Sequence, residues 1–456
     1  MASNIRDSTA QFVPMDPSVS LNYMSLFLTI VLLGILPFQF VLPLPNGFDI
    51  PLARLLAALV ICTFLIERLF RRRFSFSPLA FATLSSFLLW VGVSLFWSPR
   101  LDLALPKVAF LFNLLPLFLV WQWYAGERVL ALRLVRIFLW GATTAAIISL
   151  LIFFTQFFLG AGTTFHFLIE QVLPFFLGRE LASIVAHYPS LLVNIGGVTW
   201  LRATAFFPDP HVASFFFGMS GFLALGFSQL GKTDPRTFSM AGILFLADLL
   251  TFSRGGYLGL IVGGIAYLAL IEQPFRTFSV KRRILHILFL PLLIVMLAAP
   301  VISRLVTSFT LNDASSIERL ILWTSALETI GENPVFGTGI GNYLSSVHPL
   351  ASSTTPFYAH NLFLDLGLEL GVIGCIFFLS FFFSTAASVW KRKDRDSLTV
   401  GIFAALLLYL THSFFETALF SVHVTILLVF LFALIAGLRK TNLLQSNHET
   451  HYRNTR

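Results

Sequence analysis

The sequence predicts an all-α polytopic membrane protein, and three observations lead to that prediction. The 456-residue chain is 57% hydrophobic and only 11% charged, with a mean hydropathy of +0.84. Soluble domains carry roughly 25% charge, so this chain has too little polar surface to fold in water. Its apolar runs are about 20 residues long, the length at which an α-helix crosses a bilayer, whereas barrel strands are shorter and alternate in polarity.

The apolar runs predict about twelve transmembrane helices with both chain ends in the cytoplasm. They lie at 23–44, 52–68, 78–97, 103–122, 134–158, 211–230, 237–252, 257–272, 285–304, 361–389, 398–412 and 420–437. This divides the chain into a cytoplasmic tail (1–22), spans one to nine (23–304) with an extracytoplasmic segment (159–210), a large extracytoplasmic loop (305–360), spans ten to twelve (361–437) and a second cytoplasmic tail (438–456).

The basic residues set the predicted orientation. With both ends inside, 22 of the 30 lysines and arginines fall in cytoplasmic loops and tails, in line with the excess of positive charge on that side of membrane proteins. We therefore interpret the net charge of +8 as topology and expect no nucleic-acid partner. The other side keeps eight basic residues, which are the candidates for function: Arg54, Arg100, Lys107, Arg179, Arg202, Arg254, Arg304 and Arg319.

The two extracytoplasmic segments, 159–210 and 305–360, are expected to carry short helices. The first contains apolar stretches too short to span, from Phe165 to Leu177 and from Leu181 to Val193, which predicts helices lying at the membrane surface.

Arg254 lies in a tight connection between two predicted spans, TFSRGGYLG at 251–259. Glycines let backbone approach a ligand closely, and exposed N–H groups beside a guanidinium form an anion site. The alternative is a plain turn whose arginine reaches toward lipid headgroups. We favour the anion site because this arginine is on the side that disfavours positive charge.

Arg319 is predicted to lie on a short helix in the large loop. Ser315 and Glu318 have the spacing of a capping box, and the segment 331–334 ends the helix. Trp323 follows Arg319 by four residues and shares its face. Spacing alone leaves two interpretations open: a ligand-binding arginine, or a surface arginine stacked on Trp323 or paired with a glutamate.

The glycine-rich run GTGIG at 337–341 is not a nucleotide site. It lacks the G-x-G-x-x-G spacing, a preceding strand and the lysine of a P-loop. We predict a flexible hinge at the membrane surface.

His360 opens the tenth predicted span, and Asn361, Asp365 and Glu369 follow it as a polar stripe with a spacing of four. Ionisable groups at or inside a span are costly and usually face a cavity. A lone histidine is more often structural than catalytic, but His360 stands at the membrane surface after a polar loop. It is well placed to exchange a proton near neutral pH.

Two further polar segments lie at outer ends of predicted spans. The first, RATAFFPDPH from Arg202 to His211, is stiffened by proline and leads into the sixth span. In the second, His412 and Glu416 are four residues apart. Both segments either line a common cavity or cap helices, and for His412 and Glu416 we favour helix capping.

The sequence contains no recognisable metal or cofactor motif. It has no H-E-x-x-H, no G-x-S-x-G and no Cys/His cluster, and its D-x-D match, Asp394 to Asp396, falls in a basic cytoplasmic loop. Cys62 and Cys375 both lie in apolar runs, so no disulfide is expected. We expect neither a metal nor a cofactor.

In their order along the chain these motifs resemble the O-antigen ligase and polysaccharide polymerase superfamily. The resemblance rests on R-x3-W at Arg319 and Trp323, N-P-x2-G-x-G-x-G from Asn333 to Gly341, H-N at His360 and Asn361, and E-x-G-x2-G from Glu369 to Gly374. Ser253 to Gly256 is similar to the family's S-R-G/S-x turn. Arg202 to His211 is similar to its R-x4-F-x-h-P-N/H segment, with Pro210-His211 in place of the usual Pro-Asn.

The resemblance implies a metal-independent, inverting glycosyltransferase of the C-type fold in the bacterial cytoplasmic (inner) membrane, with its active site facing the periplasm or exterior. The donor it implies is a polyprenyl-diphosphate-linked glycan, and the acceptor is lipid A–core or a growing glycan. It assigns catalytic roles to His360, as general base on the acceptor hydroxyl, and to Arg254 and Arg319, as ligands of the diphosphate. Arg202, His211, Trp323, Asn361 and Glu369 are the expected substrate-binding residues.

Several functions remain open at this point. Ligase, polymerase and protein O-glycosyltransferase share these motifs and differ in acceptor, and the long loop followed by His-Asn favours a ligase of the O-antigen type. A transporter or flippase should show two related halves with polar groups at mid-membrane. Here no repeat is detected and the charged residues collect at one face, which favours surface chemistry.

Overall fold

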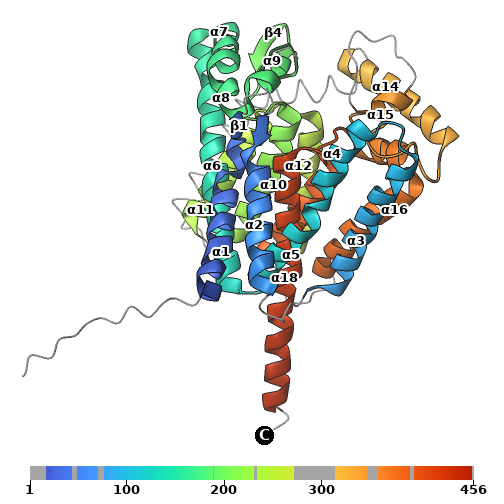
Figure 1. The fold of residues 1–456 in the computed structure, drawn as a ribbon. Helices are drawn as coiled ribbons and strands as arrows, with labels where there is room; N and C mark the ends of the chain where they lie inside the picture. Colours follow the sequence, from blue (N-terminus) through green and yellow to red (C-terminus); the bar gives the residue numbers. More distant parts are fainter. Residues whose placement is uncertain are drawn as a thin grey trace, which may run out of the picture.

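The computed structural model describes residues 17–43, 49–69, 76–187, 189–230, 234–271, 314–347, 358–390 and 395–453. This part of the chain is mostly helical, as the sequence predicts (Figure 1). Its helices and strands are α1 (Pro17–Ile35), η1 (Leu36–Phe38), β1 (Val41–Pro43), β2 (Asp49–Pro51), α2 (Leu52–Leu69), α3 (Pro78–Val93), η2 (Ser94–Trp97), α4 (Leu101–Phe112), α5 (Leu114–Ala125), α6 (Arg128–Leu159), α7 (Ala161–Phe167), η3 (Leu168–Val172), α8 (Leu173–Leu177), α9 (Arg179–His187), η4 (Pro189–Leu191), β3 (Leu192–Ile195), β4 (Val198–Leu201), α10 (Pro210–Ser228), α11 (Pro235–Leu249), α12 (Arg254–Leu270), α14 (Ala314–Glu332), α15 (Tyr343–Ser346), α16 (Leu362–Trp390), α17 (Ser397–His412) and α18 (Val422–Arg453).

Helices occupy eleven of the twelve predicted spans, and the ninth, 285–304, lies outside the described residues. Five stretches are long and apolar enough to cross a membrane: Pro78–Trp97, Leu101–Ala125, Arg128–Leu159, Pro210–Ser228 and Leu362–Ser384. Four shorter apolar helices accompany them at Met24–Phe38, Arg254–Leu270, Ser397–His412 and Val422–Leu438. Helix α2 carries the charged residues Arg54, Glu67 and Arg68, and α11 has only 15 residues. The count of twelve therefore stays a prediction, as does the division of the chain at these boundaries.

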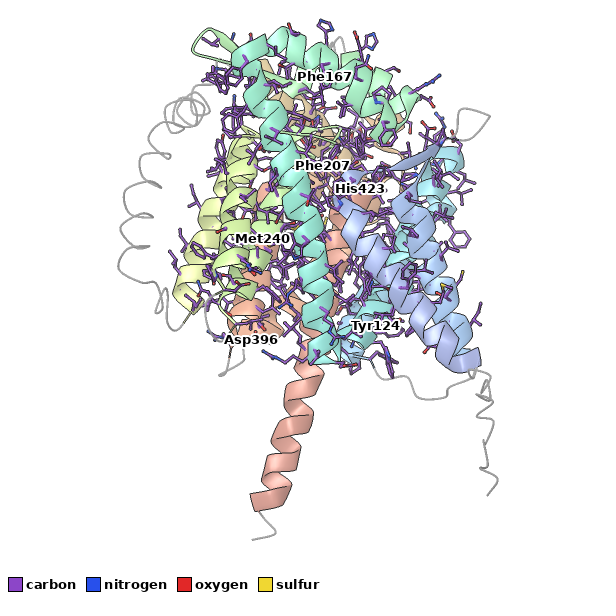
Figure 2. The ribbon with its side chains drawn as sticks, turned by 90° about the vertical axis from the view of Figure 1, so that its left-hand side faces the viewer. Tyr124, Phe167, Phe207, Met240, Asp396 and His423 are labelled. Atoms are coloured by element: carbon purple, nitrogen blue, oxygen red, sulfur yellow. The ribbon has the colours of Figure 1, made fainter. Side chains whose placement is uncertain are left out.

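The two polar segments gather at one end of the helix bundle. Figure 1 shows α7, α9, β4, α14 and α15 at the end opposite the tips of α1 and α18. Figure 2 places Phe167 at that same end and Asp396, which pairs with Arg128 at 3.0 Å, at the other. This arrangement suits the predicted topology, in which both termini and the Arg128 and Asp396 loops share one side.

Segment 159–210 contains the predicted short helices and a hairpin that the sequence analysis missed. The helical pieces α7, η3 (a π-helical turn), α8 and α9 run from 161 to 187, in place of the two predicted stretches. Strands β3 and β4 then pair in antiparallel register across Gly196 and Gly197, both with positive φ. Two residues with φ > 0 form the tight turn that hairpins favour.

Helix α10 is the most buried candidate span, and glycines allow its neighbours to approach closely. A Cβ at Gly226 would lie 2.5 Å from the Ser397 carbonyl oxygen, and one at Gly259 of α12 would lie 3.0 Å from the Leu408 carbonyl oxygen. Small residues at helix contacts are the usual means of tight packing in membranes. The packing fixes the relative positions of α10, α12 and α17.

The glycine run at 337–341 is docked, so the prediction of a flexible hinge is wrong. Helix α16 is interrupted at Gly371 (φ 67°, ψ −174°), which leaves carbonyl groups without helical partners. The N–H groups of Thr338 and Gly339 donate to the carbonyls of Leu368 and Glu369 at 2.8 and 2.9 Å. The positive φ angles of the three glycines and the burial of Ile340 let the run follow this break closely.

Candidate active site

Four helix ends meet around the predicted site residues. Helix α10 begins beside His211, α12 begins at Arg254, α16 begins after Asn361, and α17 ends at His412. A hydrogen bond from the Leu362 N–H to the Ser413 carbonyl (2.9 Å) joins the start of α16 to the end of α17. Three of the four ends are helix N-termini, where the backbone dipole attracts negative charge.

His360 forms an ion pair with Glu416. The Nδ1 atom of His360 lies 2.9 and 3.0 Å from the two carboxylate oxygens. Its side chain remains 38% exposed, whereas that of Glu416 is 9% exposed. Within the described residues Nε2 of His360 makes no hydrogen bond. The imidazole is therefore anchored through Nδ1, while its ring stays partly accessible.

The charges around the pair shift both titrations. The Glu416 carboxylate raises the pKa of His360 to about 9, against the opposing effects of burial and of the Arg319 charge. Burial alone would raise the pKa of Glu416. The charge and hydrogen bond of His360, together with the charges of His211 and Arg319, outweigh burial and hold that pKa below its ordinary value. Arg319 stands 4.0 Å from Glu416 and is 18% exposed.

Contacts on both sides of His360 hold it in place. Its own φ of 52° is left-handed, a conformation that costs a non-glycine residue about 1–3 kcal/mol and persists only where the surrounding contacts impose it. The indole N–H of Trp323 donates to the Ala359 carbonyl (3.0 Å), and the Ala359 N–H donates to Asp365 (2.8 Å). Asp365 also accepts a hydrogen bond from the Thr417 hydroxyl, so one carboxylate connects the segments carrying His360 and Glu416.

Three of the predicted substrate-binding residues make structural contacts. Trp323 supports Ala359 as described. The side-chain oxygen of Asn361 caps α16 by accepting from the N–H groups of Phe363 and Leu364 (3.0 and 3.3 Å). Glu369 forms an ion pair with Lys107 at 2.8 Å and is 3% exposed. Their roles toward a substrate stay predictions.

Arg202 supports the turn that carries Arg254. Buried at the foot of β4, it donates from Nε to the Thr251 carbonyl at 2.5 Å and from Nη1 to the Ser190 carbonyl at 3.0 Å. Arg254 is the first residue of α12, directly after Ser253, whose side chain caps that helix. The two arginines therefore belong to one local assembly, with Arg202 beneath the turn and Arg254 at its end.

His211 lies beside the His360–Glu416 pair. Its ring Nδ1 is 2.7 Å from the Ser253 hydroxyl. Its backbone N–H donates to the side-chain carboxylate of Asp209, the N-cap of α10, at 2.6 Å. Burial and the nearby Glu416 charge raise the pKa of Asp209. Donor atoms of Asp209, His211 and Glu416 all lie within 4.8 Å of one another, and in the part of the chain that the structure describes they form a possible metal-binding set.

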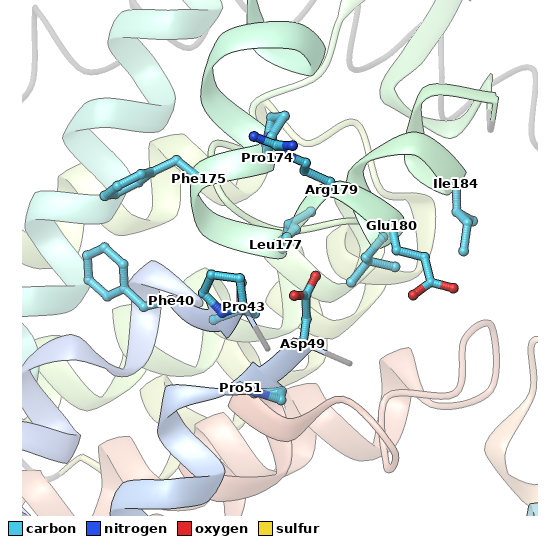
Figure 3. Close-up of a pocket in the computed structure, with 13 residues that line it drawn as sticks. Phe40, Pro43, Asp49, Pro51, Pro174, Phe175, Leu177, Arg179, Glu180 and Ile184 are labelled. Carbon is cyan, nitrogen blue, oxygen red and sulfur yellow. The ribbon is translucent and has the colours of Figure 1, made fainter. Parts of the chain in front are cut away.

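A separate cavity opens between the antiparallel strands β1 and β2 on one side and helices α8 and α9 on the other. Figure 3 shows Phe40, Pro43 and Asp49 facing Phe175, Arg179 and Glu180 across a space of about 1190 Å³. Arg179, one of the eight extracytoplasmic basic residues, lines it, but none of the residues predicted to be catalytic or substrate-binding does. We therefore place the candidate active site at the helix ends and not in this cavity.

The interpretation of His412 and Glu416 as helix caps is wrong. Glu416 follows α17 and pairs with His360, and His412 bonds to Ser253 through Nε2 at 3.0 Å. The sequence held one usable signal, a histidine and a glutamate four residues apart at an outer span end. Nothing in the spacing showed that residues 56 positions apart, His360 and Glu416, would meet.

The fold and the site define a polytopic membrane protein with a cation-rich polar centre at one end of its helix bundle. Residues 239–379 match the family model described as O-antigen ligase. The matched region contains Arg254, Arg319 and His360, whereas Arg202, His211 and Glu416 lie outside it. Comparison with curated proteins gave no match. The family match and the apolar helices support a membrane enzyme of the O-antigen ligase or polymerase type in a bacterial membrane.

Proposed function

We propose that this protein transfers a glycan from a polyprenyl-diphosphate donor to an acceptor hydroxyl at the outer face of the cytoplasmic membrane. The acceptor we propose is lipid A–core, as in O-antigen ligation. The observation that carries the proposal is the His360–Glu416 pair, with Arg319 beside it, at a point where three helix N-termini meet. The family match to residues 239–379 supports the same chemistry.

The diphosphate of the donor binds Arg254 and Arg319 in this proposal. Guanidinium groups stay charged at all relevant pH values and hold phosphate oxygens in a bidentate manner. The N-termini of α10, α12 and α16 add positive potential. As the bond between the anomeric carbon and the diphosphate oxygen breaks, negative charge grows on the leaving group, and these fixed positive groups stabilise it.

His360 acts as the general base. Its Nδ1–H donates to Glu416, which leaves Nε2 of the neutral ring to accept the proton of the acceptor hydroxyl. The acceptor oxygen then bonds to the anomeric carbon, polyprenyl diphosphate departs from the opposite face, and the configuration inverts. Glu416 orients the ring and stabilises the imidazolium that forms, the role a carboxylate has in other carboxylate–histidine pairs.

We propose that the reaction does not depend on a metal ion. The possible metal-binding set of Asp209, His211 and Glu416 shares its Glu416 carboxylate with His360 and Arg319. Two cations already bind that carboxylate, so a divalent ion would have to displace them. Transfer in a chelating buffer should match transfer with added Mg²⁺ or Mn²⁺; a metal requirement would instead assign this set as a metal site.

The decisive test measures glycan transfer by single variants reconstituted in liposomes with a lipid-linked donor. Arg254→Ala, Arg319→Ala and His360→Ala should each reduce transfer by about a hundredfold or more. Arg100→Ala is the matched control, because Arg100 is exposed and its guanidinium, among the described residues, pairs with the nearby Asp102 at 2.7 Å. If the three variants transfer glycan as well as the control, the proposal fails.

Glycan profiling of a deletion strain identifies the acceptor. Loss of attached polymer together with accumulation of lipid-linked polymer supports a ligase. Accumulation of single lipid-linked repeats identifies a polymerase instead.

A further inference from the structure

Two histidines, the buried His412 and the partly buried His211, share one serine hydroxyl behind the proposed site. The Ser253 hydroxyl lies 2.7 Å from Nδ1 of His211 and 3.0 Å from Nε2 of His412. It also accepts the Gly256 N–H at 3.4 Å as the cap of α12. Ser253 and His412 are both fully buried. The next residue after this serine is Arg254.

Counting protons gives the direction of the hydrogen bonds. A hydroxyl donates one hydrogen bond and accepts two. Because the Gly256 N–H takes one acceptor position, Ser253 donates to one histidine and accepts from the other. His211 lies beside the carboxylates of Asp209 and Glu416, and we take its Nδ1 as the acceptor of the Ser253 hydroxyl.

His412 must then donate from Nε2 to Ser253. Its Nδ1 is buried without a partner among the described residues, and an unpaired buried acceptor is more readily tolerated than an unpaired N–H group. The direction of donation therefore runs from His412 through Ser253 to His211.

His412 also contacts the backbone of the turn directly. A Cβ at Gly255 would lie 2.5 Å from Cδ2 of His412, so the imidazole fills the space beside the residue that follows Arg254. The other side of the ring stacks on Phe215 of α10, with centroids 3.8 Å apart and planes at 10°. Phe252, just before the serine, is held at a left-handed φ of 52°. The ring therefore sits between α10 and the start of α12 and fixes a strained turn.

We propose that His412, acting through Ser253, is a positioning residue that sets the place of Arg254 for the donor diphosphate. The proposal rests on the proposed function, because it takes Arg254 as a diphosphate ligand. His412 itself does not touch the substrate. Its removal changes donor recognition because it releases the turn.

Two substitutions of His412 separate the hydrogen bond from the ring. His412→Phe keeps a flat ring against Phe215 but loses the donor, whereas His412→Gln places an amide N–H near the position of Nε2. We expect His412→Phe to raise the KM for the lipid-linked donor at least tenfold and to leave the acceptor KM unchanged. His412→Gln should recover donor KM to within about threefold of the native value. Ser253→Ala should behave as His412→Phe does.

Tyr409→Phe is the matched control. Tyr409 lies one turn earlier on α17, and its ring also packs on Phe215, with centroids 5.3 Å apart. This variant should keep the native donor KM. If His412→Phe lowers only the yield of folded protein and leaves donor KM at the native value, the residue is merely structural and the proposal is overturned.

A double-variant cycle tests whether His412 acts through Arg254. Binding of polyprenyl diphosphate to purified protein is measured for Arg254→Ala, His412→Phe and the double variant. If the proposal holds, His412→Phe changes affinity less than twofold once Arg254 is already alanine. Fully multiplicative losses overturn it. Native binding and transfer by Arg254→Ala alone would instead refute the proposed function, so the two failures are distinguishable.

Discussion

Helix α16 has a cation–carboxylate pair near each end of its first half, and the two pairs differ in how accessible the cationic side chain is to a substrate. Glu369, at the break in α16, binds Lys107 at 2.8 Å and accepts the Tyr343 N–H at 3.3 Å. The Lys107 ammonium also lies over the rings of Tyr358 and Phe420. Beside the start of the helix, Glu416 binds His360, whose side chain is 38% exposed.

The comparison shows why one pair suits catalysis and the other suits architecture. Both members of the Lys107–Glu369 pair make contacts within the protein, and the pair connects α4 to the break in α16. The His360–Glu416 pair keeps one carboxylate buried while the imidazole is 38% exposed. A partly exposed imidazole backed by a fixed carboxylate can exchange protons with a substrate. The following predictions test this contrast, beginning with the largest expected effect.

Removal of the Glu416 carboxylate should abolish most transfer. Glu416→Ala leaves His360 without its anchor and leaves Arg319 without its nearby carboxylate, so we expect a loss of about a hundredfold to a thousandfold in initial rate. The measurement is glycan transfer in liposomes near pH 9, where about half of native His360 is neutral, normalised to folded protein. A loss below threefold would show that the pair is no more catalytic than Lys107–Glu369.

The pH dependence should move with the same carboxylate. A general base works only in its neutral form, and the pKa of His360 is raised to about 9, so transfer should increase with pH until about 9. In Glu416→Gln the main cause of the raised pKa is gone, and the rising limb should shift toward the ordinary histidine value near 6.5. Rate profiles measured from about pH 6 to about pH 10 cover both expected pKa values and test the shift. Identical profiles in both proteins would exclude His360 as the titrating base.

Asp365 should have an intermediate effect because it connects the two segments that carry the pair. Asp365→Ala removes the acceptor of the buried Ala359 N–H and of the Thr417 hydroxyl, so the two segments lose their common support. We expect transfer to fall about tenfold at constant protein amount. Asp365→Asn keeps an acceptor oxygen and serves as the control, with a loss of less than threefold. Equal losses in both variants would contradict this role.

Much of the architecture was predictable because apolar length and helix punctuation are local signals. The runs at 211–230 and 398–412 coincide with α10 and α17 within one or two residues. The predicted end of the loop helix at 331–334 agrees with the end of α14 at Glu332. The β3–β4 hairpin was missed although Gly196-Gly197 between apolar residues is a hairpin signal.

The site was only partly predictable because its contacts join distant segments. Arg319 and His360 stand out in the sequence as polar residues on an unfavourable side, and the structure brings both to Glu416. The identity of their shared partner depends on how α16 and α17 pack. The glycine run was misjudged for the same reason, since its partners are carbonyls freed by the break at Gly371.

The smallest effect on transfer is expected from removing the Lys107–Glu369 pair, although Glu369 was predicted from the sequence to bind substrate. Lys107→Met leaves a buried carboxylate without its cation, which should lower the free energy of unfolding by about 3 kcal/mol or more. The midpoint of thermal unfolding in detergent should therefore fall by several degrees. The double variant Lys107→Met/Glu369→Gln removes that unpaired charge and keeps an acceptor for the Tyr343 N–H, so it should be more stable than the single variant. Transfer per folded molecule should stay within about twofold of native in the double variant, because neither group faces the acceptor or the donor in our proposal. A raised KM for donor or acceptor in that variant would assign Glu369 to the substrate after all, and would remove the distinction between the two pairs on α16.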